Sequence, residues 1–319
     1  MSISIVTGVA GFIGSTLAKK LIDRGETILG IDSMTDYYPL AIKQQNLAPL
    51  LGHPQFTILK KDIADLQVGE IPDAINAVYH LAAQPGVRNS WGKEFSLYVS
   101  SNIISTQRLL EICRERSVQK FVYGSSSSVY GDRSEPELSE DMVPLPNSPY
   151  GVTKLAAERL CLTYFRNFGI PVIALRFFTV FGPRQRPDMA FQRMFLSVLN
   201  SKPFQLNGDG NQTRDFTFVD DVVDACIRAS SAKSCGDVLN IGGGNFHSML
   251  EVIDEVNSLV KPRHLEVKFG EPAKGDVRST RASIEKAKQL LGFCPKASLH
   301  EGLSKQFDFL LRNEVYQQF

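Results

Sequence analysis

The chain has 319 residues, of which 43% are hydrophobic and 22% are charged, and its formal net charge is +1. Such a balance gives no general attraction to nucleic acid or to an anionic membrane, and no run approaches the roughly 18 apolar residues that a membrane span needs. The five cysteines show no metal-ligand spacing. We therefore expect a cytoplasmic protein with buried thiols, no metal site, no nucleic-acid partner and no membrane partner.

The first predicted elements are a strand, a glycine-rich turn, a helix and a second strand. Residues 3–7 are almost all apolar, and the glycine-rich stretch 8–14 follows them directly. Residues 15–24 carry apolar side chains at helical spacing, and residues 27–31 form another apolar run. This order is the context in which a dinucleotide-binding turn is found.

Each glycine of the turn has a distinct expected use. Gly8 permits the tight turn, Gly11 lets the backbone approach a pyrophosphate, and Gly14 lets the helix pack closely on the strand. The amino end of the helix would then hold the phosphates. Asp32 ends the second strand, where an acid binds the adenosine ribose and repels a 2′-phosphate. The pattern therefore favours NAD over NADP.

Strands and helices continue to alternate up to about residue 176. Strands are predicted at residues 56–60, 77–83, 121–125 and 171–177, and helices at 102–116 and 149–168. This alternation predicts an α/β fold with a doubly wound, Rossmann-like parallel sheet. In such sheets ligands bind outside the carboxyl ends of the strands. Gly8, Asp32, Asp62, Ala82 and the serines 125–128 are all expected at that edge.

Tyr150 and Lys154 stand four residues apart in the helix that Pro149 can open, so they share one face. A free phenol has a pKa of about 10, and a nearby ammonium favours the phenolate that can accept a proton. The pair alone is more typical of a surface contact than of a catalytic pair. The neighbouring motifs favour a catalytic role for the pair, because the serines 125–128 would supply a hydroxyl at the same edge of the sheet.

The Gly-x2-Gly-x2-Gly spacing, the Tyr-x3-Lys pair and the strand-end motifs together resemble the extended branch of the short-chain dehydrogenase/reductase superfamily. The resemblance covers nearly the whole chain. It implies that Tyr150 removes a proton from a sugar hydroxyl while the carbon gives hydride to NAD⁺. It also implies that Lys154 holds the nicotinamide ribose and lowers the Tyr150 pKa, and that Ser126 bonds the reacting oxygen. The remaining cofactor-binding positions that it implies are Gly8, Gly11, Phe12, Ile13, Gly14, Asp32, Ser33, Lys43, Asp62, Ile63, Leu81, Ala82, Ala83, Gln84, Asn102, Ser125 and Phe177.

The branch of the family is indicated by the residues after the catalytic serine. A 4,6-dehydratase needs an Asp-Glu pair where Ser127 and Ser128 stand, and hydroxyls cannot do that acid–base work at neutral pH. A 4-epimerase needs no stronger acid or base. Residues 179–191 resemble UDP-glucuronate 4-epimerases, as do the loops at 36–38 and 84–88, whereas UDP-glucose 4-epimerases usually carry Asn where Thr179 stands.

A uronate carboxylate needs donors, for which Ser127, Ser128, Thr179 and the two-pronged Arg186 are the candidates. The resemblance places Arg214 and Arg278 on the diphosphate and Phe204 or Gln205 by the uracil. The full predicted substrate set is Arg88, Ser126, Ser127, Ser128, Tyr150, Thr179, Arg186, Ala190, Phe191, Phe204, Gln205, Arg214 and Arg278. Three alternatives stay open: a UDP-glucose or UDP-N-acetylglucosamine 4-epimerase, a net dehydrogenase, and a non-catalytic NAD-sensing protein.

The C-terminal part is less regular. Helices are predicted at 189–200, from Asp220, at 248–260 and at 299–315, and strands at 203–206, 213–218 and 238–241. The Gly-Asp-Gly turn at 208–210 predicts a hairpin between its flanking strands. We expect residues 1–177, with about 214–242 returning, to form the NAD-binding domain. Residues 178–213 and 243–319 would form a smaller mixed α/β domain for the UDP-sugar. The resemblance also implies a homodimer built on helices near 100–116 and 150–168.

Overall fold

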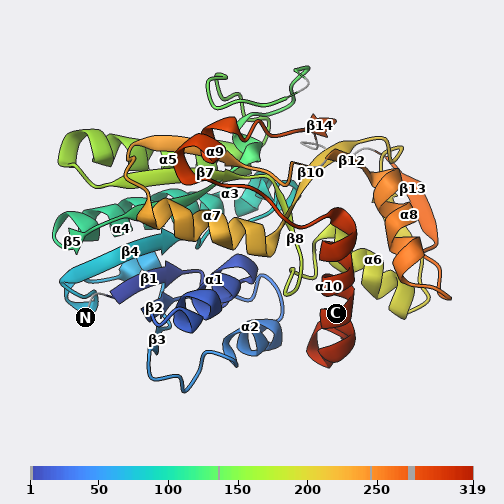
Figure 1. Ribbon diagram of the computed structural model, residues 1–319, viewed down its shortest axis with the longest axis horizontal. Coiled ribbons are helices and arrows are strands. Elements are labelled where there is room, and N and C mark those ends of the chain that lie inside the picture. Colours follow the sequence, from blue (N-terminus) through green and yellow to red (C-terminus); the bar gives the residue numbers. More distant parts are fainter. Residues whose placement is uncertain (1–2, 136, 245, 272–276, 319) are drawn as a thin grey trace.

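The computed structural model describes residues 3–135, 137–244, 246–271 and 277–318. Figure 1 shows a layered α/β part that contains the N-terminus and a second group of elements, among them α6, α8 and α10, at the other end of the molecule.

The large sheet is built from parallel strands, as the alternation of strands and helices predicts. Its order is β11-β7-β6-β4-β1-β2-β3, and β5 pairs with β4. Every pairing within it is parallel. The strands are β1 (Ile3–Thr7), β2 (Thr27–Ile31), β3 (Phe56–Leu59), β4 (Ala74–His80), β5 (Ser117–Val118), β6 (Phe121–Ser126), β7 (Val172–Phe177) and β11 (Asp237–Ile241). The order reverses direction between β1 and β4, which makes the sheet doubly wound and confirms the predicted fold class.

Helices cover both faces of this sheet (Figure 1). On one face α1 (Phe12–Asp23) packs beside α7 (Val219–Ser231), and on the other α4 (Ser105–Arg114) packs beside α5 (Pro149–Phe168). Neighbouring residues of one strand separate into two cores. Val6 belongs to the core that includes α1 and α7, and Ile5 belongs to the core that includes α4 and α5. Period-two alternation in a strand that is buried on both sides requires this division.

Three shorter helices pack against elements of the layered part. They are α2 (Leu40–Leu47), α3 (Phe95–Tyr98) and α9 (Glu285–Leu291), and a π-helical segment at Val99–Ile104 joins α3 to α4. The helix predicted at 102–116 therefore begins in a π-helical segment. Such segments widen a helix by one residue per turn and often occur at functional sites.

The second part contains a mixed sheet and a separate two-stranded sheet. In the mixed sheet, β10 (Thr213–Phe218) pairs with β8 (Thr179–Phe181), β12 (Phe246–Ser248) and β14 (Ser279–Thr280), and only the β12 pairing is antiparallel. β9 (Phe204–Asn207) pairs in parallel with β13 (Val267–Gly270). The packing helices are α6 (Ala190–Leu199), α8 (Met249–Leu259) and α10 (Leu299–Arg312).

The predicted hairpin at 208–210 is wrong, because the strands on either side of it belong to different sheets. The Gly208 amide continues the β9–β13 ladder by donating to the Gly270 carbonyl, and the Gly210 carbonyl accepts from Leu250 at the start of α8. Both glycines have a φ of 82°. Local sequence requires a sharp left-handed turn here, but it does not indicate which strands the turn connects.

The prediction that all five thiols are buried is wrong for two of them. Cys113, Cys161 and Cys226 are buried, Cys235 is half-buried, and Cys294 is exposed, all as free thiols. Over the described ranges the longest helices remain too short or too polar to cross a bilayer.

Candidate functional site

The glycine-rich turn between β1 and α1 forms a tight cradle. Gly8 has a φ of 68°, in the left-handed region where other side chains are strained. A Cβ added at Gly14 would lie only 2.1 Å from the Gly8 carbonyl oxygen. Gly11 is the N-cap of α1 and gives it no side-chain cap. The amino end of α1 therefore offers a positive dipole end and close backbone access to an anionic group.

Asp32 at the end of β2 is held in a fixed position. Its carboxylate accepts hydrogen bonds from the Ala10 amide (3.0 Å) and the Met34 amide (2.8 Å). The Lys43 ammonium lies 3.3 Å from the same carboxylate and also donates to the Thr35 hydroxyl. The Asp32 carboxylate, which the sequence predicts to bind the ribose, is thus held in a fixed orientation by groups of the protein itself.

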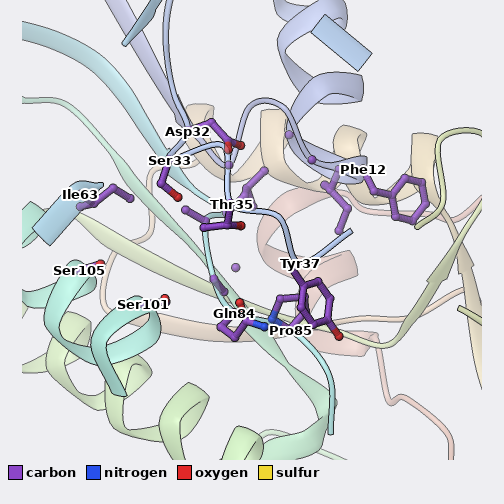
Figure 2. Close-up of a pocket in the computed structure, with 18 of the residues that line it drawn as sticks. Phe12, Asp32, Ser33, Thr35, Tyr37, Ile63, Gln84, Pro85, Ser101 and Ser105 are labelled. Carbon is purple, nitrogen blue, oxygen red and sulfur yellow. The ribbon is translucent and has the colours of Figure 1, made fainter. Parts of the chain in front are cut away.

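A single pocket collects the predicted cofactor residues from the ends of β1, β2, β3, β4, β6 and β7. Its lining includes every predicted cofactor position except Asn102. Figure 2 shows Asp32, Ser33, Thr35 and Tyr37 reaching the pocket from the segment that follows β2, while Ser101 and Ser105 reach it from the helical segment before and within α4. The convergence of strand ends that the sequence predicts is therefore present in space.

Asn102 lies behind the pocket wall. It is 2% exposed, accepts from the Gln84 amide (2.7 Å), and donates to the Gln84 carbonyl and the Thr153 hydroxyl. Asn102 therefore fixes the loop at Gln84, and through Thr153 it also contacts α5.

Several lining residues escaped the sequence analysis. They are Ile31, Thr35, Tyr37, Tyr38, Lys61, Pro85, Ser101, Ser105, Gly124 and, as a cofactor-side neighbour, Arg186. Ser101 and Ser105 had a detectable signal, because two serines four apart on a helix share one face. Ser105 donates to the Asp62 carboxylate at 3.4 Å. Ile31 and Gly124 lie in β2 and β6, and the others come from loops whose path the sequence does not specify.

The α5 helix brings Tyr150 and Lys154 to this pocket. Its N-cap Ser148 accepts from the Gly151 amide, and Pro149 occupies its first turn, as expected for a helix start. A Cβ at Gly151 would lie 2.5 Å from the Ser128 carbonyl oxygen. Glycine at this position therefore lets the first turn of α5 approach the serine turn that carries Ser126.

Burial raises the pKa of Tyr150, while a hydrogen bond with Ser126 and the positive charge of Arg186 lower it. The lowering of the Tyr150 pKa by Lys154 stays a prediction. Burial lowers the pKa of Lys154 to about 8, against the raising effect of Cys161 and Glu158. The Lys154 ammonium lies 4.7 Å from the centre of the Tyr123 ring, so it faces the sheet as well as the pocket.

His80, at the end of β4, fixes the loop that begins at Leu81. The Thr7 hydroxyl oxygen accepts from the Leu81 and Ala82 amides (3.1 and 3.0 Å), so its own proton must go to His80 Nδ1, 2.8 Å away. His80 Nε2 then carries the ring proton and donates to the Thr106 hydroxyl at 2.9 Å. Burial lowers the pKa of His80 to about 3, so the imidazole is neutral.

The segment 182–186 is attached to three helices. The Gly182 amide donates to Gln306 of α10, and the Gln185 side chain accepts from the Gln192 amide of α6 and from Gln306. Arg184 has a φ of 69° and donates to Ser15 of α1 at 3.3 Å. A non-glycine residue in that conformation persists only where its surroundings hold it.

Arg186 reaches the pocket with its guanidinium already engaged. Its Nε and Nη2 each donate to Asp188 at 2.9 Å, in a two-pronged pair, and its side chain is 19% exposed. The ring centre of Tyr37 lies 6.0 Å from the guanidinium carbon. The guanidinium of Arg186 has the two-pronged geometry that binds a carboxylate, and here the carboxylate is that of Asp188.

Most of the other predicted substrate residues lie outside this pocket. Arg214 donates to the carbonyls of Val277 (2.6 Å) and Arg278 (3.3 Å), which brings the two predicted diphosphate arginines together. With its amide oriented to accept, Asn207 of β9 takes two hydrogen bonds from Arg88. Positions outside the lining of the pocket are Arg88, Ser126, Ser127, Ser128, Thr179, Ala190, Phe191, Phe204, Gln205, Arg214 and Arg278.

The side chain of Phe191 is placed in the core. It is 2% exposed, and its ring centre lies 4.9 Å from that of Phe216 and 5.3 Å from that of Phe181. Phe204 is likewise buried, at 3% exposure, whereas Gln205 beside it is exposed. Among the described residues no cluster of His, Cys, Asp and Glu is arranged to hold a metal ion.

The comparisons with known proteins extend over nearly the full chain. Residues 4–242 match the model of the NAD dependent epimerase/dehydratase family. A UDP-glucuronic acid 4-epimerase from Bacillus cereus, solved in complex with UDP-glucuronic acid and NAD, superposes with a TM-score of 0.94 and is 42% identical, over 98% of this chain and 99% of that one.

Two of the relatives that match by sequence carry different names. A UDP-glucuronate 4-epimerase of Thermodesulfobacterium geofontis is 38% identical over 98% of this chain and 97% of its own length. An uncharacterized UDP-glucose epimerase of Bacillus subtilis is 43% identical over 98% of both chains. The similarities agree on the epimerase family but differ in the sugar that they name.

Proposed function

Because the chain belongs to the NAD dependent epimerase/dehydratase family, we propose that it is an NAD-dependent 4-epimerase that interconverts UDP-glucuronate and UDP-galacturonate. One observation carries the proposal. Tyr150, Lys154 and Arg186 line the same pocket as the glycine cradle and Asp32. A proton acceptor, a dinucleotide site and a fork for a carboxylate thus meet in one place.

The pocket suits NAD in its shape and in its donors. The glycine cradle leaves no room for a Cβ at Gly14 and presents the amino end of α1, as a pyrophosphate site requires. Asp32 would bind the adenosine ribose, and the Lys154 ammonium would bind the nicotinamide ribose. When bound, the oxidised cofactor supplies a reversible hydride acceptor and a positive charge.

The protein's own groups manage the proton and the substrate oxygen. Tyr150 accepts the proton of the C4 hydroxyl, helped by the two groups that lower its pKa, Ser126 and Arg186. Ser126 hydrogen-bonds the same oxygen and orients it. After the 4-keto sugar has rotated in the site, Tyr150 returns the proton to the C4 oxygen of the opposite epimer. No further acid or base is needed, which agrees with the serines at positions 127 and 128.

The uronate is the substrate that the site supports best, because Arg186 stands in the pocket as a two-pronged donor. Ser127, Ser128 and Thr179 would add hydroxyl donors to the same carboxylate. A carboxylate held in this way also keeps its bond to the sugar ring out of line with the π system of the C4 carbonyl. That geometry would suppress loss of CO₂ from the β-keto acid.

Three further statements belong to this proposal. Residues 1–177 with about 214–242 serve the cofactor, and residues 178–213 with 243–319 serve the UDP-sugar. The protein acts in the cytoplasm, which agrees with its free thiols. It forms a homodimer through α4 and α5, near which Ile104, Val152 and Phe168 expose 46–52% of their surface. Light scattering coupled to gel filtration tests the dimer directly.

The test of the function is incubation with UDP-glucuronate, UDP-glucose and UDP-N-acetylglucosamine in turn, with separation of the 4-epimers. We expect conversion of UDP-glucuronate and little or none of the neutral sugars. Conversion of UDP-glucose without conversion of UDP-glucuronate would refute the uronate assignment. Steady accumulation of NADH in place of an epimer would indicate a net dehydrogenase.

A further inference from the structure

A buried ion pair lies directly behind the catalytic helix. Arg176 of β7 donates through Nη2 to Glu158 Oε1 at 2.7 Å and through Nε to Oε2 at 3.0 Å. The side chains are 1% and 0% exposed. Removing two charges from water is costly, and a well-packed apolar pair often stabilises a fold as well or better. Stability alone is therefore a weak explanation of this pair.

The pair is connected to the wall of the pocket through Ser125. The Ser125 hydroxyl donates to Glu158 Oε2 at 2.7 Å. Ser125 and Arg176 are register partners in the β6–β7 ladder, so a fixed sheet holds both of them. Ser125 lines the pocket and immediately precedes the catalytic Ser126. Any movement of the Glu158 carboxylate is thus transmitted to the strand end that carries Ser126.

Arg176 is itself held from the far side. Its guanidinium carbon lies 4.7 Å from the centre of the Tyr130 ring, and the Tyr130 hydroxyl donates to Asn240 Oδ1 at 2.7 Å. Asn240 also donates to the carbonyls of Leu138 and Ser283. The orientation of Glu158 is therefore determined by a chain of contacts that ends in β11 and its neighbouring loops.

Glu158 also lies one helical turn after Lys154, on the same face of α5. The other groups that face Lys154 are His80 from β4, Tyr123 from β6 and Cys161 from α5. His80 is neutral, since burial lowers its pKa to about 3, and burial raises the pKa of Cys161. Of these groups, Glu158 is the carboxylate, and it forms the two-pronged ion pair with Arg176.

We propose that Glu158 is a positioning residue for the proposed epimerisation: it fixes Ser125 beside the catalytic Ser126 and supplies the negative charge that buried Lys154 requires, while Arg176 holds Glu158 in place. This inference rests on the proposed function for its kinetic part only. Its physical part concerns Lys154 and is independent of the sugar.

The first test variant is Glu158→Gln, which keeps the shape and removes the charge. Because it leaves Arg176 buried without its partner, Glu158→Gln/Arg176→Met is the second variant, which removes both charges and replaces the ion pair by an apolar contact. The matched control is Glu111→Gln on α4, a partly exposed acid that accepts from Tyr164 of α5. It makes the same chemical change on the neighbouring helix.

The decisive measurement is the titration of Lys154 by NMR in lysine-labelled protein with its cofactor, assigned with Lys154→Arg. In Glu158→Gln we expect the midpoint to fall, because the ammonium loses a nearby opposite charge. In the double variant it should fall less, because the like charge of Arg176 is removed as well. In Glu111→Gln it should not move. An unchanged midpoint in Glu158→Gln would overturn the inference, whatever happens to stability.

The second readout is the rate of UDP-glucuronate epimerisation against pH. We expect kcat at pH 7 to fall at least about tenfold in both variants, with KM changed less than about twofold, because no contact with the sugar is lost. The loss of rate at high pH should begin at lower pH, in step with the NMR midpoint. Equal losses at every pH would show a purely structural role. If the wild type does not convert UDP-glucuronate, the proposed function fails, while the Lys154 titration still decides the inference.

Discussion

Protonation of His80 should destabilise the fold in mild acid. An imidazolium would have to donate from Nδ1 to the Thr7 oxygen, whose lone pairs already accept from the Leu81 and Ala82 amides. Burial lowers the pKa of His80 to about 3 from an unfolded value of about 6.5. A depressed pKa means that the contribution is present above pH 6.5 and is lost as pH falls from there toward 3.

The size of the effect follows from those two pKa values. Between pH 7 and pH 5 the unfolded chain gains the proton and the folded chain does not, so the free energy of unfolding falls by about 2 kcal/mol through this one group. Other groups titrate over the same range. The prediction therefore concerns a difference between wild type and His80→Gln, whose amide does not titrate.

The assay is urea denaturation at pH 7 and pH 5, followed by circular dichroism. At pH 7 the wild type should be the more stable protein, and its advantage over His80→Gln should shrink by about 2 kcal/mol at pH 5. The exposed His264→Gln serves as the control and should run parallel to the wild type at both pH values. An equal gap between wild type and His80→Gln at the two pH values would refute the reasoning.

Three further predictions concern the site itself. Tyr150→Phe should fold normally and lose at least about 100-fold in epimerisation rate, because the hydroxyl that accepts the proton is gone; an unchanged rate would exclude it as the base. Gly14→Ala should cost about 1–3 kcal/mol of stability and weaken NAD binding, measured by calorimetry, since its Cβ would lie 2.1 Å from the Gly8 carbonyl oxygen. Arg186→Lys should lower kcat/KM for UDP-glucuronate roughly 10- to 100-fold, because a lysine cannot bind a carboxylate in two-pronged fashion, and it should leave any activity on UDP-glucose nearly unchanged. Equal losses on both sugars would show that Arg186 does not recognise the carboxylate.

The order of elements in the large sheet could be predicted because its signals are local. Apolar runs, the glycine turn and Pro149 each specify a strand, a turn or a helix start within a few residues, and the handedness of parallel connections then brings the strand ends together. The cofactor pocket follows from this geometry. Asn102 shows where this reasoning fails. Its place in the sequence suggested contact with the cofactor, whereas its side chain forms hydrogen bonds with Gln84.

The second part of the chain was harder to predict because its pairings are set by distant residues. Nothing near Gly208 indicates that β9 will pair with β13, some sixty residues later, in place of β10. The pKa shifts in the site could not be predicted from the sequence either. The Tyr150 pKa depends on burial, on the hydrogen bond with Ser126 and on Arg186, which a loop brings in from outside α5. The spacing of Tyr150 and Lys154 suggests only the shared face.

The attachment of residues 182–186 to α1, α6 and α10 has a consequence for how this enzyme can change its substrate. A segment held through the Gly182 amide and through the side chains of Arg184 and Gln185 cannot be lengthened or shortened without disturbing contacts to three helices. New sugar preferences are therefore accessible by exchanging single side chains such as Arg186, whereas insertions or deletions here should destabilise the fold.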